Sequence, residues 1–336
     1  MLEQRFSWKA AAWLGLLYAG LIVLPLLLSY SQREIAVFLL ISVLLVVSYR
    51  LLTLTGEWSL AHVVIMGAGA YTSALLSKRL GVPIPLSMLL GACAAALIAY
   101  LLSFPLFRMK GFYFLIGSFA AGEIIRLLWK RFREPFGGPK GIKLIPNLPE
   151  IEIGPLYIDF FEPQVYYYFC LFVVSISIWI MYRLERSPIG LTFHAIHWQD
   201  NLAESVGVNT RRFRTMAFVI ASFFAGLSGS LLAHYVGTIN PNSFDVAEMV
   251  YVLTWAIVGG TATIYGPIMG AVVLTVINEI FLRELGFDQL RPLFYGVIMI
   301  AAVMFLPKGL ESLVPKVGAL LSRRKASGDA AKTAES

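Results

Sequence analysis

The stretch Ile35–Leu52 reads IAVFLLISVLLVVSYRLL, and Arg50 is its only charged residue. A helix rises about 1.5 Å per residue, so a helical run of this length comes close to crossing the hydrocarbon core of a bilayer, which is about 30 Å thick. Such a stretch is typical of a membrane-spanning helix. It also gives the scale on which the remaining sequence can be divided.

Nine other apolar runs flank this one, and charged residues, prolines or glycines separate them. The ten runs are Ala12–Ser29, Ile35–Leu52, Leu60–Ser77, Ile84–Phe107, Phe112–Trp129, Val165–Tyr182, Phe213–Val236, Val246–Val258, Gly266–Leu282 and Pro292–Leu306. We therefore expect an all-α polytopic membrane protein with about ten transmembrane helices. Spans two to five and seven to ten form two sets of four. Each span lies five crossings from its counterpart in the other set, so the two run in opposite directions, as an inverted repeat requires.

The composition agrees with insertion into lipid. Of 336 residues, 58% are hydrophobic and 14% charged, against roughly 45–50% and 25% in soluble domains, which excludes an ordinary soluble enzyme. The net charge of +7 is scattered over short connectors and the tail, so it favours membrane lipid over nucleic acid as a partner. Cys93 and Cys170 lie inside apolar runs and predict neither a disulfide nor a thiolate metal site. The first run follows Arg5 and Lys9, but it exceeds the core of a signal peptide and is expected to remain as a helix.

The basic residues also predict the orientation. With both termini on the inner side, 16 Lys and Arg fall inside and 10 outside, while Arg126 lies within a span. Cytoplasmic connectors carry the excess of Lys and Arg in membrane proteins, so we expect both termini in the cytoplasm. Residues 1–317 then form the transmembrane domain, and residues 318–336 form a disordered basic cytoplasmic tail.

Two connectors between the spans are long. The outer one, residues 130–164, contains six prolines, which preclude a continuous helix. We expect an ordered, irregular cap with short strands at Ile151–Ile153 and Leu156–Ile158.

The inner connector, residues 184–212, holds a short amphipathic segment made of Asn201, Leu202, Ala203, Glu204, Val206 and Gly207. Asn201 is expected to cap a helix and Glu204 to complete a capping box, while Gly207 ends the helix in a left-handed turn. Leu202 and Val206 would then share one face of the helix.

Polar groups within spans are costly and usually face protein or a water-filled path. Glu123 and Arg126 are three residues apart and can pair on one helix face. Two interpretations stay open, a structural ion pair or a Glu123 carboxylate that meets a translocation path. Asn278 and Glu279 are interpreted as structural, because Arg283 lies close behind them in the chain.

Small residues gather in the third span, at Gly67 and Gly69, and after the eighth, at Gly259 and Gly260. Such residues permit close helix packing, or a broken helix whose exposed backbone lines a binding site. Both interpretations stay open.

Motifs of catalysis are missing from the sequence. The histidines, His62, His194, His197 and His234, form no His-Glu-x-x-His motif, and there is no Gly-x-Ser-x-Gly elbow. His194 and His197 are expected on a solvated face. A phosphate-binding loop is missing too, so ATP-driven transport would need a nucleotide site on another subunit. We expect no catalytic residue, no metal site and no cofactor in this chain.

Taken in order, several motifs resemble those of one family. They are Gly56–His62, Met66–Tyr71, Gly111–Phe114, Gly122–Arg126, Gly137–Ile142, Arg186–Gly190, Ala203–Asn209, Ala217–Phe218, Ala225–Gly229, Val258–Gly260, Tyr265–Ala271 and Leu306–Leu310. Over roughly residues 45–310 the sequence resembles the branched-chain amino acid ABC importer permeases of the LivM type. It departs from their pattern at residues 194–200 and at Phe136.

The resemblance implies the ABC importer permease fold in a bacterial cytoplasmic (inner) membrane. The implied partners are a second related permease, two cytoplasmic ATPases that bind the ATP, a periplasmic or lipid-anchored solute-binding protein and an amino-acid substrate. The implied substrate path includes Gly67, Gly69, Glu123, Gly259 and Gly260. Residues 201–207 would couple to an ATPase, and the solute-binding protein would dock at Gly137, Gly138 and Gly141.

Two other functions stay open. An ion-coupled secondary transporter would need a functional acidic residue within a span, for which Glu123 is the candidate. An ABC permease for urea or amides would have a similar sequence, because selectivity in this family lies largely in the binding protein.

Overall fold

The computed structural model describes residues 8–153, 156–278, 290–306 and 309–312. Apart from one two-stranded sheet, the regular secondary structure of this part of the chain is helical. The α-helices are α1 (Trp8–Leu27), α2 (Tyr30–Thr53), α3 (His62–Leu80), α4 (Ile84–Leu106), α5 (Phe112–Arg131), α6 (Pro163–Glu185), α7 (Pro188–Trp198), α8 (Asp200–Ser205), α9 (Thr210–Val236), α10 (Val246–Gly259), α11 (Tyr265–Ile277) and α12 (Arg291–Phe305).

Each of the ten apolar runs overlaps one of these helices, which confirms the helical membrane fold. Within the described residues, six helical stretches are long and apolar enough to cross a bilayer, namely α2, α4, α5, α6, α9 and a segment that begins at Pro292. The apolar helices α10 and α11 are shorter. The number of ten crossings and the inverted repeat stay predictions. The predicted tail, Glu279 and Arg283 lie outside the described residues.

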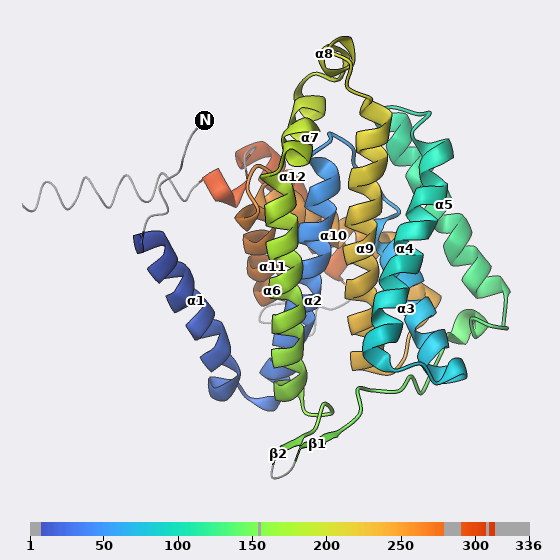
Figure 1. Cartoon of the computed structure of the whole chain (residues 1–336), viewed down its shortest axis with the longest axis vertical. Coiled ribbons are helices and arrows are strands. Elements are labelled where there is room, and N and C mark those ends of the chain that lie inside the picture. Colours follow the sequence, from blue (N-terminus) through green and yellow to red (C-terminus); the bar gives the residue numbers. More distant parts are fainter. Residues whose placement is uncertain (1–7, 154–155, 279–289, 307–308, 313–336) are drawn as a thin grey trace, which may run out of the picture.

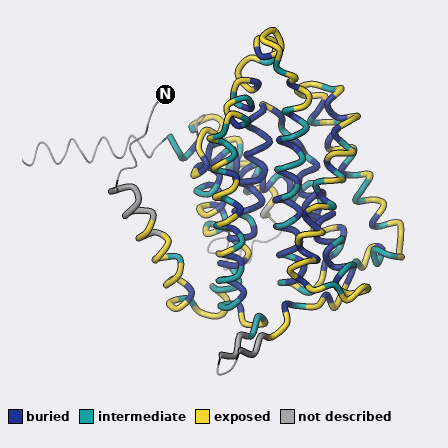
Figure 2. The backbone as a smooth tube through the Cα atoms, in the orientation of Figure 1, coloured by how far each residue is buried: buried dark blue, intermediate teal, exposed yellow. Residues whose placement is uncertain are grey.

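The long helices form one bundle, in which α9 lies beside α2, α3 and α4 (Figure 1). The helix α2 also packs on α6 and α11, and α10 packs on both α11 and α12. The helices α2 and α9 are mostly buried, whereas only a minority of the residues of α4, α5 and α12 are buried and many of their large apolar side chains are exposed (Figure 2). Exposed apolar surface of this extent suits contact with lipid.

Small residues bring the central helices together. A Cβ atom added to Gly69 of α3 would lie only 2.3 Å from the carbonyl oxygen of Gly226 in α9. Side chains are therefore excluded from this contact, and the two backbones pack directly against each other.

The connector of residues 130–164 contains the short 3-10 helix η1 (Gly138–Lys140) and the antiparallel strands β1 (Ile151–Ile153) and β2 (Leu156–Ile158). Both predicted strands are thereby confirmed. An isolated bridge between Ile142 and Ile239 ties this connector to the one between α9 and α10.

The inner connector differs from its prediction in two ways. It contains α7, a helix that the sequence analysis missed, although Ser187 and Pro188 are a typical N-cap and first helical residue. The second helix, α8, begins at Asp200 rather than at Asn201, and its N-cap makes no side-chain hydrogen bond.

The predicted capping box is therefore wrong. Asn201 lies inside α8, after Asp200, and the Glu204 carboxylate accepts a hydrogen bond from the Thr210 hydroxyl over 2.6 Å instead of completing a capping box. The left-handed turn at Gly207 is confirmed by its φ of +87°.

Candidate functional site

Arg50 lies in the last turn of α2 and is the largest fully buried side chain of the described structure, with 2% of its surface exposed. Its guanidinium donates two hydrogen bonds, of 2.8 and 2.7 Å, to the carboxylate of Glu185 at the end of α6. This bidentate geometry is the strongest form of an arginine–carboxylate pair.

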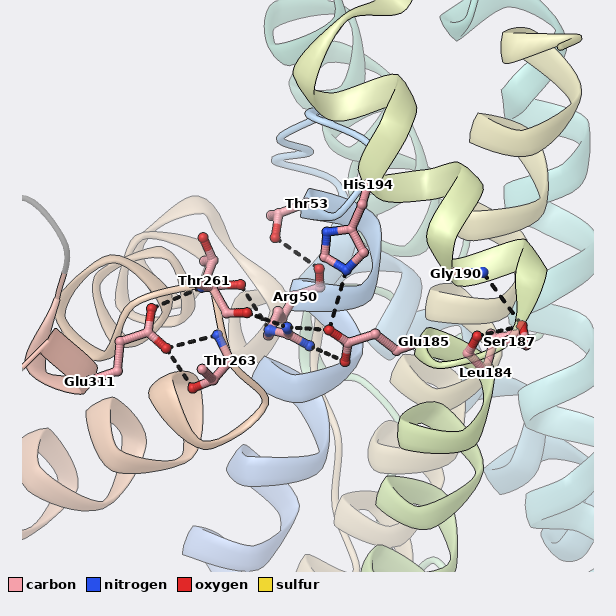
Figure 3. A network of polar contacts seen from close by, with 11 residues as sticks. Arg50, Thr53, Leu184, Glu185, Ser187, Gly190, His194, Thr261, Thr263 and Glu311 are labelled. Carbon is pink, nitrogen blue, oxygen red and sulfur yellow. Dashed lines mark hydrogen bonds and ion pairs between the residues drawn. The ribbon is translucent and has the colours of Figure 1, made fainter. Parts of the chain in front are cut away.

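The same guanidinium also holds the loop between α10 and α11. Its remaining donors reach the carbonyl oxygens of Thr261, over 2.9 Å, and of Ala262, over 3.1 Å. The Glu311 carboxylate binds the same loop, because it accepts hydrogen bonds from the backbone N–H groups of Ala262 and Thr263 (Figure 3). The loop is thus held by a cation through its carbonyls and by an anion through its amides.

Glu185 connects this arrangement to α7. The His194 ring of α7 approaches the Glu185 carboxylate within 3.5 Å, so His194 does not lie on a purely solvated face as expected. A Cβ atom on Gly190 would lie 2.0 Å from the Glu185 carbonyl oxygen, which shows how closely α7 turns back on the end of α6. We call Arg50, Glu185, His194, Thr261, Ala262, Thr263 and Glu311 the Arg50 cluster.

A second polar group anchors α8. Arg214 of α9 lies 3.3 Å from Glu57, which is buried in the connector after α2, and 3.2 Å from Asp200 of α8. Burial raises the pKa of Glu57 above its ordinary value, although the charge of Arg214 works against this. Partial burial acts in the same direction on Asp200, but the hydrogen bond from Lys110 and the charge of Arg214 hold the pKa of Asp200 below its usual value.

A groove of about 790 Å³ lies beside the Arg50 cluster. Its walls come from α5, α10 and α12 and are largely apolar, with lining residues that include Leu115, Leu253, Ala256, Ile257 and Val303. Thr261 and Glu311 line it as well, so the cluster forms part of its wall.

The structure places the predicted glycines at close contacts. Gly67 lies against the rings of Phe244 and Trp129, and Gly259 against the backbone of Gly266. Of the five residues assigned to a substrate path, Gly260 lines the groove. Their role in a substrate path stays a prediction.

Glu123 and Arg126 form the predicted pair on α5, in which Arg126 Nε donates to a Glu123 oxygen over 2.8 Å. Gly137, Gly138 and Gly141 all have positive φ angles around η1, which explains the glycines there without reference to docking. A role in docking stays a prediction.

The sequence analysis missed the Arg50 cluster. A single arginine at the end of an apolar run was the available signal, but its partners lie more than a hundred residues away. Within the described residues, no three His, Cys, Asp or Glu side chains come together as a metal site requires.

The buried apolar bundle, with its charged cluster at one helix end, defines a multi-pass helical membrane protein. The chain matches the family model described as "branched-chain amino acid transport system / permease component" over residues 32–303, and it belongs to this family of transport permeases. It is 30% identical to the high-affinity branched-chain amino acid transport system permease protein LivM of Escherichia coli K12, covering 85% of this chain and 71% of that protein.

More distant relatives include the high-affinity branched-chain amino acid permease protein LivH of Salmonella typhimurium, 27% identical over 41% of this chain and 44% of LivH. The autoinducer 2 import system permease protein LsrC of an Enterobacter species is 27% identical over 60% of this chain and 57% of LsrC. No solved structure matches the chain.

Proposed function

We propose that the chain forms half of the translocation pathway of an ATP-driven importer for branched-chain or related amino acids. Family membership and the name of its relative LivM support this substrate class. The proposed partners are a second permease, two cytoplasmic ATPases and a solute-binding protein, in a bacterial inner membrane with both termini in the cytoplasm. The chain itself would bind no nucleotide and catalyse no reaction.

The observation that carries the proposal is the double attachment of Arg50. One guanidinium binds Glu185, three residues before α7, and the loop that ends α10. A displacement of α7 and α8 by an ATPase would therefore move the end of α10 through a buried, charge-assisted contact. Leu202 and Val206, both exposed on or next to α8, are the proposed ATPase contacts.

The groove between α5, α10 and α12 is the proposed face toward the second permease. It is open to the surface, and its lining is largely apolar except near the Arg50 cluster. A second permease laid over this face would close it into a path that passes Gly260 and continues along α5 toward Glu123. The solute-binding protein would dock at the opposite connector, around Gly137, Gly138 and Gly141.

Reconstitution in proteoliposomes tests the function. The chain with the second permease, ATPases and binding protein encoded beside it should accumulate labelled leucine only when ATP is enclosed with the ATPases. Accumulation driven by a proton or sodium gradient in vesicles that contain this chain alone would contradict the proposal and favour the secondary transporter.

A further inference from the structure

A cavity of about 510 Å³ lies on the other side of α10 from the groove. It is enclosed by α2, α3, α9, α10, α11 and α12, with the buried side chains of Leu45, Val63 and Met66 at its apolar wall. Exposed Thr238 and Ser243, in the connector between α9 and α10, line its other end. Its volume is in the range of small-molecule binding sites.

Two buried polar atoms that line this cavity have no hydrogen-bond partner among the described residues. Trp255, 6% exposed, has an indole Nε1–H without an acceptor, and Asn278, 8% exposed, has an amide oxygen without a donor. Buried polar groups are nearly always hydrogen-bonded in folded proteins, because an unmet group loses its hydration without compensation. One donor and one acceptor are therefore available to a bound molecule.

The charged residues among the described lining of the cavity are acidic. Glu34 and Glu248 line it, and none of its described lining residues is Lys or Arg. The neighbouring cation, Arg33, donates instead to the carbonyl oxygens of Pro25 and Leu28. A partly enclosed site of this kind favours a ligand that carries a positive charge.

We propose that this cavity binds an amino acid with an aliphatic side chain, inside the single chain rather than between two permeases. The ammonium group would face Glu34 and the Asn278 oxygen, the carboxylate would accept from Trp255 Nε1, and the side chain would point toward Leu45. The inference rests on the proposed function, which supplies the solute class.

The helix α10 then separates the bound solute from the groove. Its Val252 and Trp255 line the cavity, whereas Leu253, Ala256 and Ile257 line the groove. The helix ends at the loop that the Arg50 cluster holds. A solute would leave the cavity for the groove when α10 moves, which assigns this helix the role of a partition.

Equilibrium binding of labelled L-leucine to the full chain in lipid nanodiscs, without ATPases, tests the cavity. Saturable binding is expected. Isoamylamine, which keeps the ammonium group, should compete at least about tenfold better than 4-methylpentanoate, which lacks it. Trp255→Phe and Asn278→Leu should each weaken leucine binding about tenfold, and Glu34→Gln should weaken isoamylamine binding similarly. Trp179→Phe on the exposed face of α6 and Glu162→Gln at its start are matched controls that should change neither.

Absence of saturable binding, or binding that all three cavity variants leave unchanged, would overturn the inference. Equal competition by 4-methylpentanoate would overturn it too, because the cavity would then not select the ammonium group. Leucine binding that survives a failure of ATP-driven uptake would contradict the proposed function alone, whereas intact uptake without binding in the cavity would contradict the inference alone.

Discussion

Arg50 shows how far a sequence can be interpreted at the scale of one residue. A lone arginine in an apolar run predicts a buried or interfacial charge that needs partners, and the structure supplies Glu185 and two carbonyl oxygens. The identity of those partners could not be predicted, because three separate helices and a loop must first be brought together. The Glu123–Arg126 pair could be predicted, since one helical turn separates the two residues.

Arg50→Ala is expected to destabilise the protein by about 3–5 kcal/mol, because it leaves the Glu185 carboxylate and the loop carbonyls without their donor. Arg126→Ala, which breaks a more exposed pair on α5, should cost at most about 1 kcal/mol. Thermal unfolding in detergent compares the two variants. Equal losses of stability in the two variants would contradict the conclusion that the buried Arg50 contributes more to stability than Arg126.

Glu57 should give the protein a distinctive pH dependence. Burial raises its folded-state pKa, so the folded protein holds the proton more tightly, and the cost of the buried charge disappears as the pH falls from neutral toward about 4.3. The stability of the wild type relative to Glu57→Gln should therefore increase over this range.

Asp200 should behave in the opposite way. Its folded-state pKa is lowered, so its contribution is present above about 3.9 and is lost as the pH falls further. Unfolding curves of Glu57→Gln and Asp200→Asn at several pH values check both signs. A wild-type protein that loses stability relative to Glu57→Gln on acidification would refute the assignment.

At the scale of elements, length and apolar content predicted the helices well, and the proline-rich connector yielded its two strands. The prediction of a helix cap failed where a side chain of the local motif makes a contact elsewhere in the structure. The Glu204 carboxylate, which the sequence analysis assigned to a capping box, instead accepts a hydrogen bond from the Thr210 hydroxyl. The helix α7 was missed because its apolar residues resemble a loose continuation of the sixth span.

The contact of α3 with α9 predicts the effect of a single methyl group. Gly69→Ala would press Cβ onto the Gly226 backbone and should cost about 1–3 kcal/mol. Gly296→Ala in α12 meets nothing within 4 Å and should be neutral or gain up to about 1 kcal/mol. Thermal unfolding distinguishes the variants. A harmless Gly69→Ala would show that the helices are not in direct contact.

The helix α8 is predicted to contact the ATPase through its exposed apolar residues. Leu202→Asp should weaken association with the ATPase about tenfold or more, because a charge replaces an apolar contact. Leu144→Asp, on the connector at the opposite end of the bundle, is the control. Copurification yields of the two variants provide the measurement, and equal yields would count against α8 as the coupling helix.

At the scale of the whole molecule, the sequence predicted a helical membrane permease but neither the groove nor the cavity. The groove and the cavity arise from six or more helices that meet across α10, and their linings combine residues from distant parts of the chain. The arrangement supports one account of transport. In the account proposed above, an ATPase would move α7 and α8, the Arg50 cluster would convey the movement, and α10 would change its position between cavity and groove.

The ratio of leucine transported to ATP hydrolysed, in proteoliposomes that hold the complete importer, tests this coupling most directly. Arg50→Lys keeps the charge but loses the bidentate fork, and Glu185→Gln removes the anion. The account predicts that both variants keep most of their ATP hydrolysis while transport falls about tenfold or more. If the ratio of leucine transported to ATP hydrolysed stayed unchanged in both variants, the account would be contradicted, whatever the absolute rates of transport and hydrolysis.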